Sequence, residues 1–196
     1  MTDKLNNNIP NDKKLFACFV GGRIPTCTIE LHDIFFLVAS KIEDTYLPII
    51  DKWWGDSYIH LDSYIDLSMV ENYKITPVLD SQDQLEKLFF INFGGYQANT
   101  FGETHTYHFV VANSPSEAIK KAKAKLIHLW DSQAMVHLDD NLLLEADDCI
   151  DLSQKYQLKL TKVEENNKNN EDSCAPVIVH SNKRLLMNKK ELKYLF

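Results

Sequence analysis

The chain has 196 residues, a formal net charge of −7 at neutral pH, 44% hydrophobic residues and 25% charged residues. These values are typical of a folded globular protein and exclude a fibrous or intrinsically disordered chain. No apolar run reaches the roughly 20 residues that span a bilayer, no signal-peptide pattern opens the chain, and the acidic charge disfavours a nucleic-acid partner. The four cysteines include no CxxC pair, so we expect reduced thiols and a cytoplasmic location away from membranes.

The first predicted elements are two strands joined through a pair of glycines. An apolar run over residues 15–20 predicts a strand that is closed by Gly21 and Gly22. We expect these glycines to provide either a positive φ or a close backbone approach. The alternation over residues 32–39 predicts a second strand whose core face carries His32 and every second residue after it.

A helix and two short strands follow. The pattern from Ser40 to Glu43 resembles a capping box and predicts a helix start. Strands are expected near residues 58–61 and 74–78.

The stretch from residue 15 to 40 is repeated from residue 88 to 113 without a gap. LFACFVGGRIPTCTIELHDIFFLVAS and LFFINFGGYQANTFGETHTYHFVVAN are identical at nine of 26 positions. IHLD also recurs as VHLD, which pairs His60 with His137, and IDLS occurs in both halves. Such self-similarity predicts two copies of one structural unit.

The second copy predicts the same elements. Strands are expected over residues 88–93 and 105–112, a capped helix from Ser114, and strands near 134–138 and 156–163. The expected fold is therefore α+β, an internally duplicated β-β-α-β-β module of mainly antiparallel sheets, each packed on one helix. The predicted organisation is a polar arm (1–14), a first module (15–78), a linker (79–87), a second module (88–163), a polar linker (164–175) and a basic C-terminal segment (176–196).

These motifs resemble the bacterial domain of unknown function 1543. The pattern is Gly-Gly, then E-x-H, then F-x-V-A, then a capped helix before a strand with HLD, and it is present twice. The resemblance implies a tandem pair of such domains. It supplies no activity, because the family is uncharacterised.

Candidate site residues are the polar groups that both copies share. In the first copy these are Gly21, Gly22, Glu30, His32 and His60, and in the second Gly94, Gly95, Glu103, His105 and His137.

Three interpretations of this set stay open. The carboxylates could be buried and lock the hairpins by accepting local hydrogen bonds. Each Glu-His-His set could hold a divalent metal. The Gly-Gly turns could form a backbone nest for an anion or small molecule.

Two functions compete on this basis. The first is a non-enzymatic ligand-binding or protein-interaction module without a cofactor, whose partner would be another protein or a second copy of the chain. The second is a metal-dependent or acid/base enzyme that uses the paired Glu-x-His motifs. No P-loop, GxGxxG, nucleophile elbow or HExxH motif is present.

The opposite face of the second strand also needs a cover. Phe35 and Leu37 lie there, and leaving them in water would forfeit about 1.5–3 kcal/mol each. The other copy, a second subunit or the leucines of the C-terminal segment could cover it, and we expect the C-terminal segment.

Overall fold

The computed structural model describes residues 12–54, 58–80, 83–95, 99, 101–129, 145–164 and 177–179. The strands are β1 (Lys14–Gly22), β2 (Leu31–Ala39), β3 (Ile59–Asp66), β4 (Met69–Val70), β5 (Tyr73–Pro77), β6 (Lys87–Gly95), β7 (Thr104–Ala112), β8 (Glu145–Asp151), β9 (Leu158–Lys162) and β10 (Val177–Ile178). The helices are the 3-10 turn η1 (Ile42–Thr45), α1 (Tyr46–Lys52), α2 (Pro115–Leu129) and α3 (Leu152–Tyr156).

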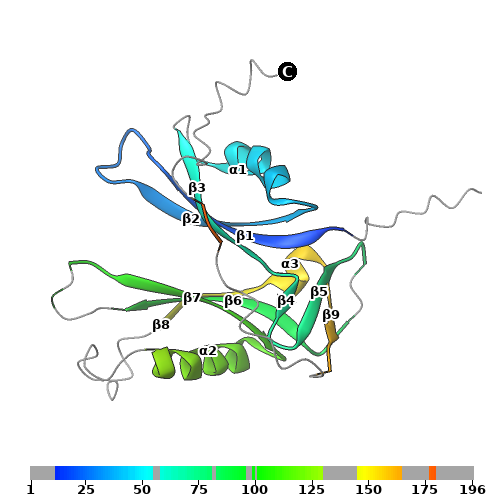
Figure 1. The fold of residues 1–196 in the computed structure, drawn as a ribbon. Helices are drawn as coiled ribbons and strands as arrows, with labels where there is room; N and C mark the ends of the chain where they lie inside the picture. Colours follow the sequence, from blue (N-terminus) through cyan, green and yellow to red (C-terminus); the bar gives the residue numbers. More distant parts are fainter. Residues whose placement is uncertain are drawn as a thin grey trace, which may run out of the picture.

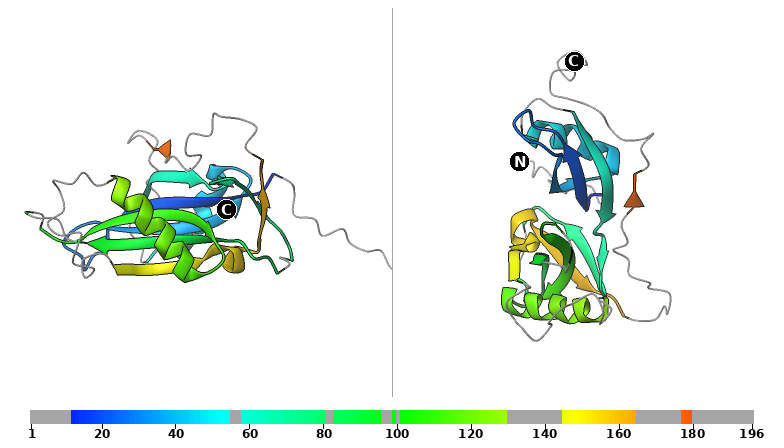
Figure 2. Two further views of the ribbon diagram at one scale, coloured as in Figure 1. Left: turned by 90° about the horizontal axis from the view of Figure 1, so that it is seen from below. Right: turned by 90° about the vertical axis from the view of Figure 1, so that its left-hand side faces the viewer.

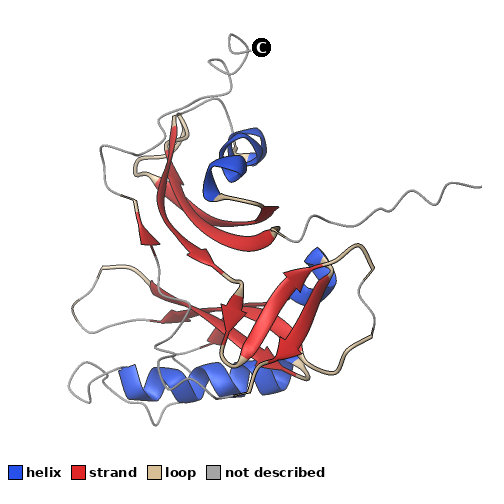
Figure 3. Cartoon of the chain, turned by 45° about the vertical axis from the view of Figure 1, so that its right-hand side comes forward, coloured by secondary structure: helices blue, strands red, loops and turns tan. Residues whose placement is uncertain are grey.

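The strands form three sheets. The first sheet has the order β10-β3-β1-β2, the second β7-β6-β8, and a smaller third sheet β4-β5-β9. The first two sheets lie face to face, with α1 on the outer side of one and α2 on the outer side of the other (Figures 1 and 2). The third sheet closes one end of the molecule (Figure 3). The expected α+β class with mostly antiparallel sheets is confirmed.

The central strands β1 and β6 are apolar apart from their first residue, a lysine in each, and Asn92 of β6, because both of their faces are largely buried. Successive side chains of a strand alternate between faces, and each of these strands has a sheet on one side and a helix on the other. Leu15 and Ala17 of β1 point into the core between the sheets, whereas Phe16 and Cys18 point into the core beneath α1. A continuous apolar run is the pattern that such a strand requires.

The core between the sheets is built around Phe36 of β2. Its ring packs edge-on against Phe90 at 5.1 Å and against Phe109 at 6.3 Å, and it also meets Tyr156 of α3. The face of β2 that carries Phe36 is thus a core face, as the alternation predicts. Val38 on the same face is 38% exposed, so the core ends before the strand does.

The outer face of β2 is covered by α1, and the expectation that the C-terminal segment covers it is wrong. Leu37 belongs to the same core as Ile49 and Ile50 of α1, and Phe35 packs on Trp53 with ring centroids 6.1 Å apart. The C-terminal segment contributes an edge strand instead. Its strand β10 pairs with β3, and Val179 packs against the margin of this core. Residues 180–196, which hold the C-terminal leucines, lie outside the described residues.

The two helices begin differently. In α2 the expected cap is present, since Glu117 N donates to Ser114 Oγ at 3.3 Å and Asn113 N donates to Glu117 Oε2 at 3.0 Å. The predicted cap at Ser40 is wrong. The chain enters η1 after Lys41 with no side-chain cap and only then continues as the seven-residue α1.

The strands β5 and β9 join the two halves of the chain in the third sheet. Ile75 lies opposite Leu160, with Tyr73 opposite Lys162 and Pro77 opposite Leu158. Two further backbone hydrogen bonds extend this ladder, Val78 N to Gln157 O and Val163 N to Asn72 O, both 2.8 Å. Residues 15–78 and 88–163 are therefore linked by a shared ladder as well as by a shared core.

Candidate functional site

The first cluster of polar side chains is built on a row across three strands. Gly21 of β1 lies opposite His32 of β2 on one side and opposite His60 of β3 on the other. Because paired residues of an antiparallel sheet point to the same side, the two imidazoles flank a position that has no side chain.

This glycine provides the space in which the imidazoles converge. A Cβ on Gly21 would lie 2.6 Å from His60 Nε2 and 2.9 Å from His32 Nε2. Gly22 gives a close approach of another kind, since its Cβ would lie 2.8 Å from the Trp53 ring.

Gly21, Gly22, Gly94 and Gly95 are strand residues rather than turn residues. All four have cross-strand partners, and Gly102 is the one described glycine with a positive φ. Of the two roles expected for the glycine pair, close approach is correct and positive φ is wrong. The predicted anion nest lacks its geometry, because ladder pairing engages the backbone of these residues.

A β-bulge brings a fourth polar residue, Asp62, to the cluster. The β1–β3 register shifts between Phe19 and Val20, whose partners are Ser63 and Leu61, so that Asp62 falls in the bulge. Bulges commonly redirect a side chain in this way. Sequence reasoning did not select Asp62.

Each carboxylate of the cluster lies 3.4–3.9 Å from both imidazoles. Asp62 oxygens lie 3.5 Å from His32 Nε2 and 3.4 Å from His60 Nε2. Glu30 oxygens lie 3.5 Å from His60 Nδ1 and 3.9 Å from His32 Nε2. One donor atom each from Glu30, His32 and His60 falls within a 4.8 Å group, a spacing that suits a metal ion.

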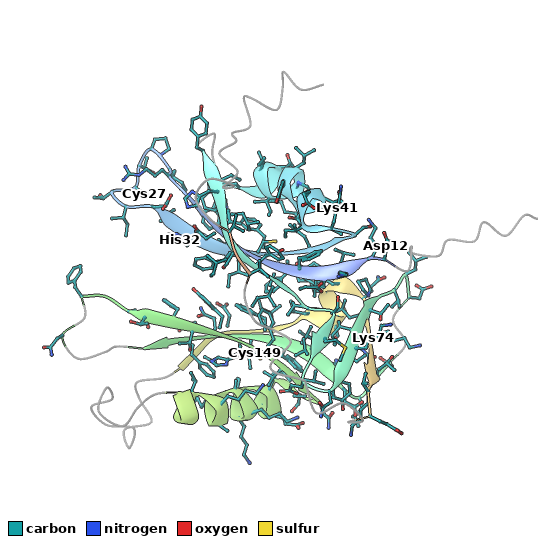
Figure 4. The ribbon with its side chains drawn as sticks, in the orientation of Figure 1. Asp12, Cys27, His32, Lys41, Lys74 and Cys149 are labelled. Carbon is teal, nitrogen blue, oxygen red and sulfur yellow. The ribbon has the colours of Figure 1, made fainter. Side chains whose placement is uncertain are left out.

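The cluster is open on one side. The side chain of His60 is 10% exposed, whereas those of His32 and Glu30 are 40% and 38% exposed. In Figure 4, His32 lies in the part of β2 next to the β1–β2 loop that carries Cys27. The expectation that Glu30 is mostly buried is wrong, because Glu30 lies in the β1–β2 loop just before β2 and its side chain is partly exposed. It does contact the histidines of its own sheet.

The second sheet carries a related cluster over Gly94. His105 lies opposite Gly94, and its ring nitrogens lie 3.7 Å from Glu103 Oε2 and 3.3 Å from Asp147 Oδ2. A Cβ on Gly94 would lie 2.5 Å from both Asp147 Oδ2 and Glu103 Oε1. Here two carboxylates converge where two imidazoles converge in the first sheet. Glu103, like Glu30, is half-exposed rather than buried.

His137 lies outside the described residues, and the register assigns its predicted place to another residue. Glu145 is the partner of Gly94, as His60 is the partner of Gly21. The proposed equivalence of His60 with His137 is therefore wrong. The β6–β8 bulge between Asn92 and Phe93 places Asp147 as the β1–β3 bulge places Asp62.

A signal for these aspartates is present in the sequence. HLDSYIDLS and EADDCIDLS align without a gap when the shared IDLS is taken as the anchor. Asp62 and Asp147 each lie four residues before the aspartate of that motif. Matching VHLD to IHLD instead hides this alignment. It places the counterpart of β3 eight residues before the position that the IDLS alignment gives, which is the position of β8.

The two clusters lie at the same end of the molecule, next to the β1–β2 and β6–β7 loops and away from the third sheet (Figure 1). An aromatic row connects the facing sheets there. Phe19 stacks on His32 with centroids 5.3 Å apart and meets Tyr107 of β7 at 6.0 Å. Burial and the nearby Asp33 carboxylate both raise the pKa of Tyr107, so this phenol is neutral at physiological pH.

Comparison with known proteins identifies a family similarity for part of the chain. Residues 27–77 match the model of a Domain of Unknown Function, DUF1543, as a single stretch from the β1–β2 loop to the end of β5. The crystal structure of a protein Il1583 from Idiomarina loihiensis is 28% identical, with a TM-score of 0.59 over 90% of this chain and 100% of that one. No curated protein matches the chain. In the described part of the chain, no helix has the length and apolar character needed to cross a membrane.

Proposed function

We propose that the chain is a metal-binding module in which Glu30, His32 and His60 hold a divalent transition-metal ion such as Zn²⁺, with Asp62 as a neighbouring carboxylate. The observation that carries the proposal is the convergence of Glu30, His32 and His60 within 4.8 Å beside a glycine that leaves the space open. Two imidazoles with carboxylates form a common ligand set for such ions.

The distances favour an ion over direct hydrogen bonds. Hydrogen bonds between N–H and oxygen are about 2.7–3.2 Å long, shorter than the 3.4–3.9 Å contacts in this cluster. Tetrahedral zinc with bonds of about 2.0–2.2 Å separates neighbouring donor atoms by about 3.3–3.6 Å. Glu30 Oε1 and His60 Nδ1, 3.5 Å apart, have the spacing of two ligands of one ion, whereas Asp62 faces the other ring nitrogen of His60, Nε2.

The open side of the cluster determines what the ion does. His60 holds the buried side, while the exposed edges of His32 and Glu30 leave room for water or a small ligand. A divalent ion with an open position polarises what binds there. This unites the two functions expected from the sequence, since a ligand-binding module and a metal-dependent enzyme would use the same open position.

We also propose that the module is internally duplicated. The hairpins β1–β2 and β6–β7 have the same register, and β1–β3 and β6–β8 have bulges at corresponding places. The β5–β9 ladder is symmetric about the pair Ile75–Leu160, so that the pair Tyr73–Lys162 on one side corresponds to the pair Pro77–Leu158 on the other. Such symmetry is the pattern of an isologous interface between two related units. Lys14 pairs with Asp66 as Lys87 pairs with Asp151, at 2.7 and 3.2 Å.

The proposal retains a cytoplasmic location and a bacterial origin. Cys18, Cys27 and Cys149 are free thiols, which suits a reducing compartment. Burial raises the pKa of Cys18 to about 11 despite its contact with Thr45, so this thiol is inert. The proposal also includes a macromolecular partner, another protein or a second copy of the chain. It would bind at the end of the molecule that carries the β1–β2 and β6–β7 loops.

The test is zinc titration of the full-length protein by calorimetry, after removal of bound metal with a chelator. We expect tight binding at the first cluster and a loss of at least tenfold in affinity in Glu30→Gln and His32→Gln. Glu43→Gln is the matched control, because Glu43 is an exposed carboxylate in η1.

Circular dichroism checks that each variant is folded. Wild-type protein that binds no zinc, or His32→Gln protein that binds zinc as tightly as wild type, would exclude the proposed site.

A further inference from the structure

The imidazole of His60 has a carboxylate at each of its two ring nitrogens. Glu30 Oε1 lies 3.5 Å from Nδ1, and Asp62 Oδ1 lies 3.4 Å from Nε2. The two nitrogens of one imidazole point in different directions, and they differ in which of them carries the proton of the neutral ring. One nitrogen can therefore bind the ion while the other keeps its proton and donates it to a carboxylate.

The two carboxylates differ in their surroundings. The donor atoms that lie within 4.8 Å of one another come from Glu30, His32 and His60, and Asp62 is outside this group. The Glu30 side chain is 38% exposed on the open side of the cluster, whereas that of Asp62 is 19% exposed. Glu30 thus lies on the side of His60 where the ion would bind, and Asp62 lies behind the ring.

We propose that Asp62 is a positioning residue of the zinc site, which accepts a hydrogen bond from Nε2–H of His60 and so leaves Nδ1 to bind the ion. This inference rests on the proposed function, because it concerns the orientation of one of the proposed ligands. A histidine that binds a metal almost always donates its second ring N–H to a carboxylate, a carbonyl or water, and this bond fixes both the tautomer and the direction of the ring.

The distance is compatible with this role. The 3.4 Å contact between Asp62 Oδ1 and His60 Nε2 is slightly longer than a formed N–H···O hydrogen bond. Hydrogen bonds in functional sites are often long before a ligand binds and shorten in the complex. We therefore expect zinc at Nδ1 and the bond at Nε2 to form together.

The backbone of Asp62 is held by the strands on both sides of β3. The register shift against β1 turns its side chain toward the cluster, and its carbonyl accepts a hydrogen bond from Val179 N at 2.8 Å. Val179 follows β10 directly and packs against the margin of the core beneath α1. The segment that contains β10 therefore supports the carboxylate that orients His60.

The first measurement is a long-range ¹H–¹⁵N correlation spectrum of the full-length, zinc-loaded protein. The ¹⁵N shifts of each imidazole show which nitrogen binds zinc and which retains its proton, and His60→Gln assigns the signals. We expect His60 to bind zinc through Nδ1 and to keep a proton on Nε2. In Asp62→Asn, zinc affinity measured by calorimetry should fall about tenfold to a hundredfold.

A second measurement separates an orienting role from direct ligation, because Asp62 Oδ2 also lies 3.5 Å from His32 Nε2. Visible absorption bands of bound Co²⁺ depend on the atoms that ligate the ion. Asp62→Asn saturated with Co²⁺ should keep the wild-type spectrum, whereas Glu30→Gln should change it.

Asp51→Asn is the matched control, because Asp51 is an exposed carboxylate of α1, the helix that covers the other face of this sheet. It should equal wild type in zinc affinity, in the imidazole signals and in the Co²⁺ spectrum. Circular dichroism checks that both Asp→Asn variants are folded, and the wild-type imidazole signals test the role without any variant of Asp62.

The outcomes separate this inference from the proposed function. If wild-type protein binds zinc through Nε2 of His60, or if Asp62→Asn binds zinc as tightly as wild type, the orienting role is wrong and the zinc site stands. If the Co²⁺ spectrum of Asp62→Asn changes as that of Glu30→Gln does, Asp62 is a ligand and the orienting role is again wrong. If wild-type protein binds no zinc, the proposed function is wrong and the orienting role falls with it.

Discussion

Gly21 and Gly22 are adjacent residues of one strand that serve different parts of the molecule. The missing side chain of Gly21 leaves space for two imidazoles, and that of Gly22 leaves space for Trp53 and Ile59 in the core beneath α1. This follows from strand alternation, which directs neighbouring residues to opposite faces. The pair therefore joins the polar cluster to the core that supports it.

Substitution of Gly21 by alanine should damage metal binding more than folding. The new Cβ would lie 2.6 Å from His60 Nε2 and 2.9 Å from His32 Nε2, and must displace both rings. Because those atoms are side-chain tips, the rings can move aside without disturbing the backbone. We expect zinc affinity to fall at least tenfold in calorimetry, with a melting temperature close to that of wild type.

The matched variant Gly22→Ala should show the opposite pattern. Its Cβ would lie 2.8 Å from Trp53 and 2.9 Å from Ile59, in a packed core. Overpacking of this kind costs about 1–3 kcal/mol of unfolding free energy, while the zinc ligands stay in place. Equal zinc affinity in wild type and Gly21→Ala would contradict this assignment of roles.

The sequence indicated most of the candidate cluster but not its completion. Glu30 and His32 could be selected because they recur in the second copy, whereas His60 was selected through a match to His137 that the register does not support; the structure brings all three together. Asp62 enters only through the bulge, which depends on the detailed pairing of β1 with β3. Single-sequence patterns carry no information on where a ladder slips by one residue.

At the scale of elements, Asp66 fixes the end of β3 to the start of β1. Its carboxylate accepts hydrogen bonds from Lys14 Nζ at 2.7 Å and from the backbone N–H and hydroxyl of Ser68. Burial by itself raises the pKa of Asp66, but the hydrogen bonds from Lys14 and Ser68 together outweigh it and leave the pKa lowered. The ionised form is therefore the form that stabilises the fold.

This pKa shift predicts an acid-dependent loss of stability. A carboxyl group whose pKa is lower in the folded state stabilises the fold fully above its ordinary pKa, here 3.8, and less as pH falls through the folded value. Asp66→Asn should be less stable than wild type at pH 7 by up to about 1 kcal/mol, since the ion pair is partly solvated. The difference should shrink below pH 4 in urea unfolding.

Asp44→Asn is the control for this measurement, because Asp44 is an exposed carboxylate in η1. It should leave both the stability and its pH dependence close to those of wild type. A gap between wild type and Asp66→Asn that stays constant down to pH 2 would show that the carboxylate charge contributes nothing.

The elements themselves differ in how far sequence could predict them. The hairpins β1–β2 and β6–β7 follow from apolar runs and alternation, which are local properties. A helix was also expected before Trp53, but its start was not, because the chain reaches α1 through η1 instead of a side-chain cap. The sequence does not indicate that α1 covers Phe35, because the packing of so short a helix depends on tertiary contacts and not on its own residue pattern.

At the scale of the whole molecule, the two halves depend on each other in two places. The core between the sheets takes side chains from both, including Phe36 from β2 and Phe90 from β6. The third sheet pairs β5 with β9. A half on its own would expose the inner face of its large sheet and one edge of β5 or β9, so neither half has a complete core.

This mutual dependence predicts that the halves unfold as one unit. Phe36→Ala removes the ring at the centre of the shared core, and such changes cost about 3–5 kcal/mol. Hydrogen exchange measured by mass spectrometry should therefore accelerate in peptides from β6 by as much as in peptides from β1. The effect on β6 is diagnostic, since Phe36 belongs to the other sheet.

Val38→Ala is the matched control, because Val38 is on the same strand and face as Phe36 but is 38% exposed. It removes little buried area, so exchange in both sheets should stay near wild type. If Phe36→Ala accelerated exchange in β1 while the amides of β6 kept their protection, the second sheet would be stable without the first. The core between the sheets would then be a contact between two independent units, and the symmetric β5–β9 ladder would be the link that holds those units together.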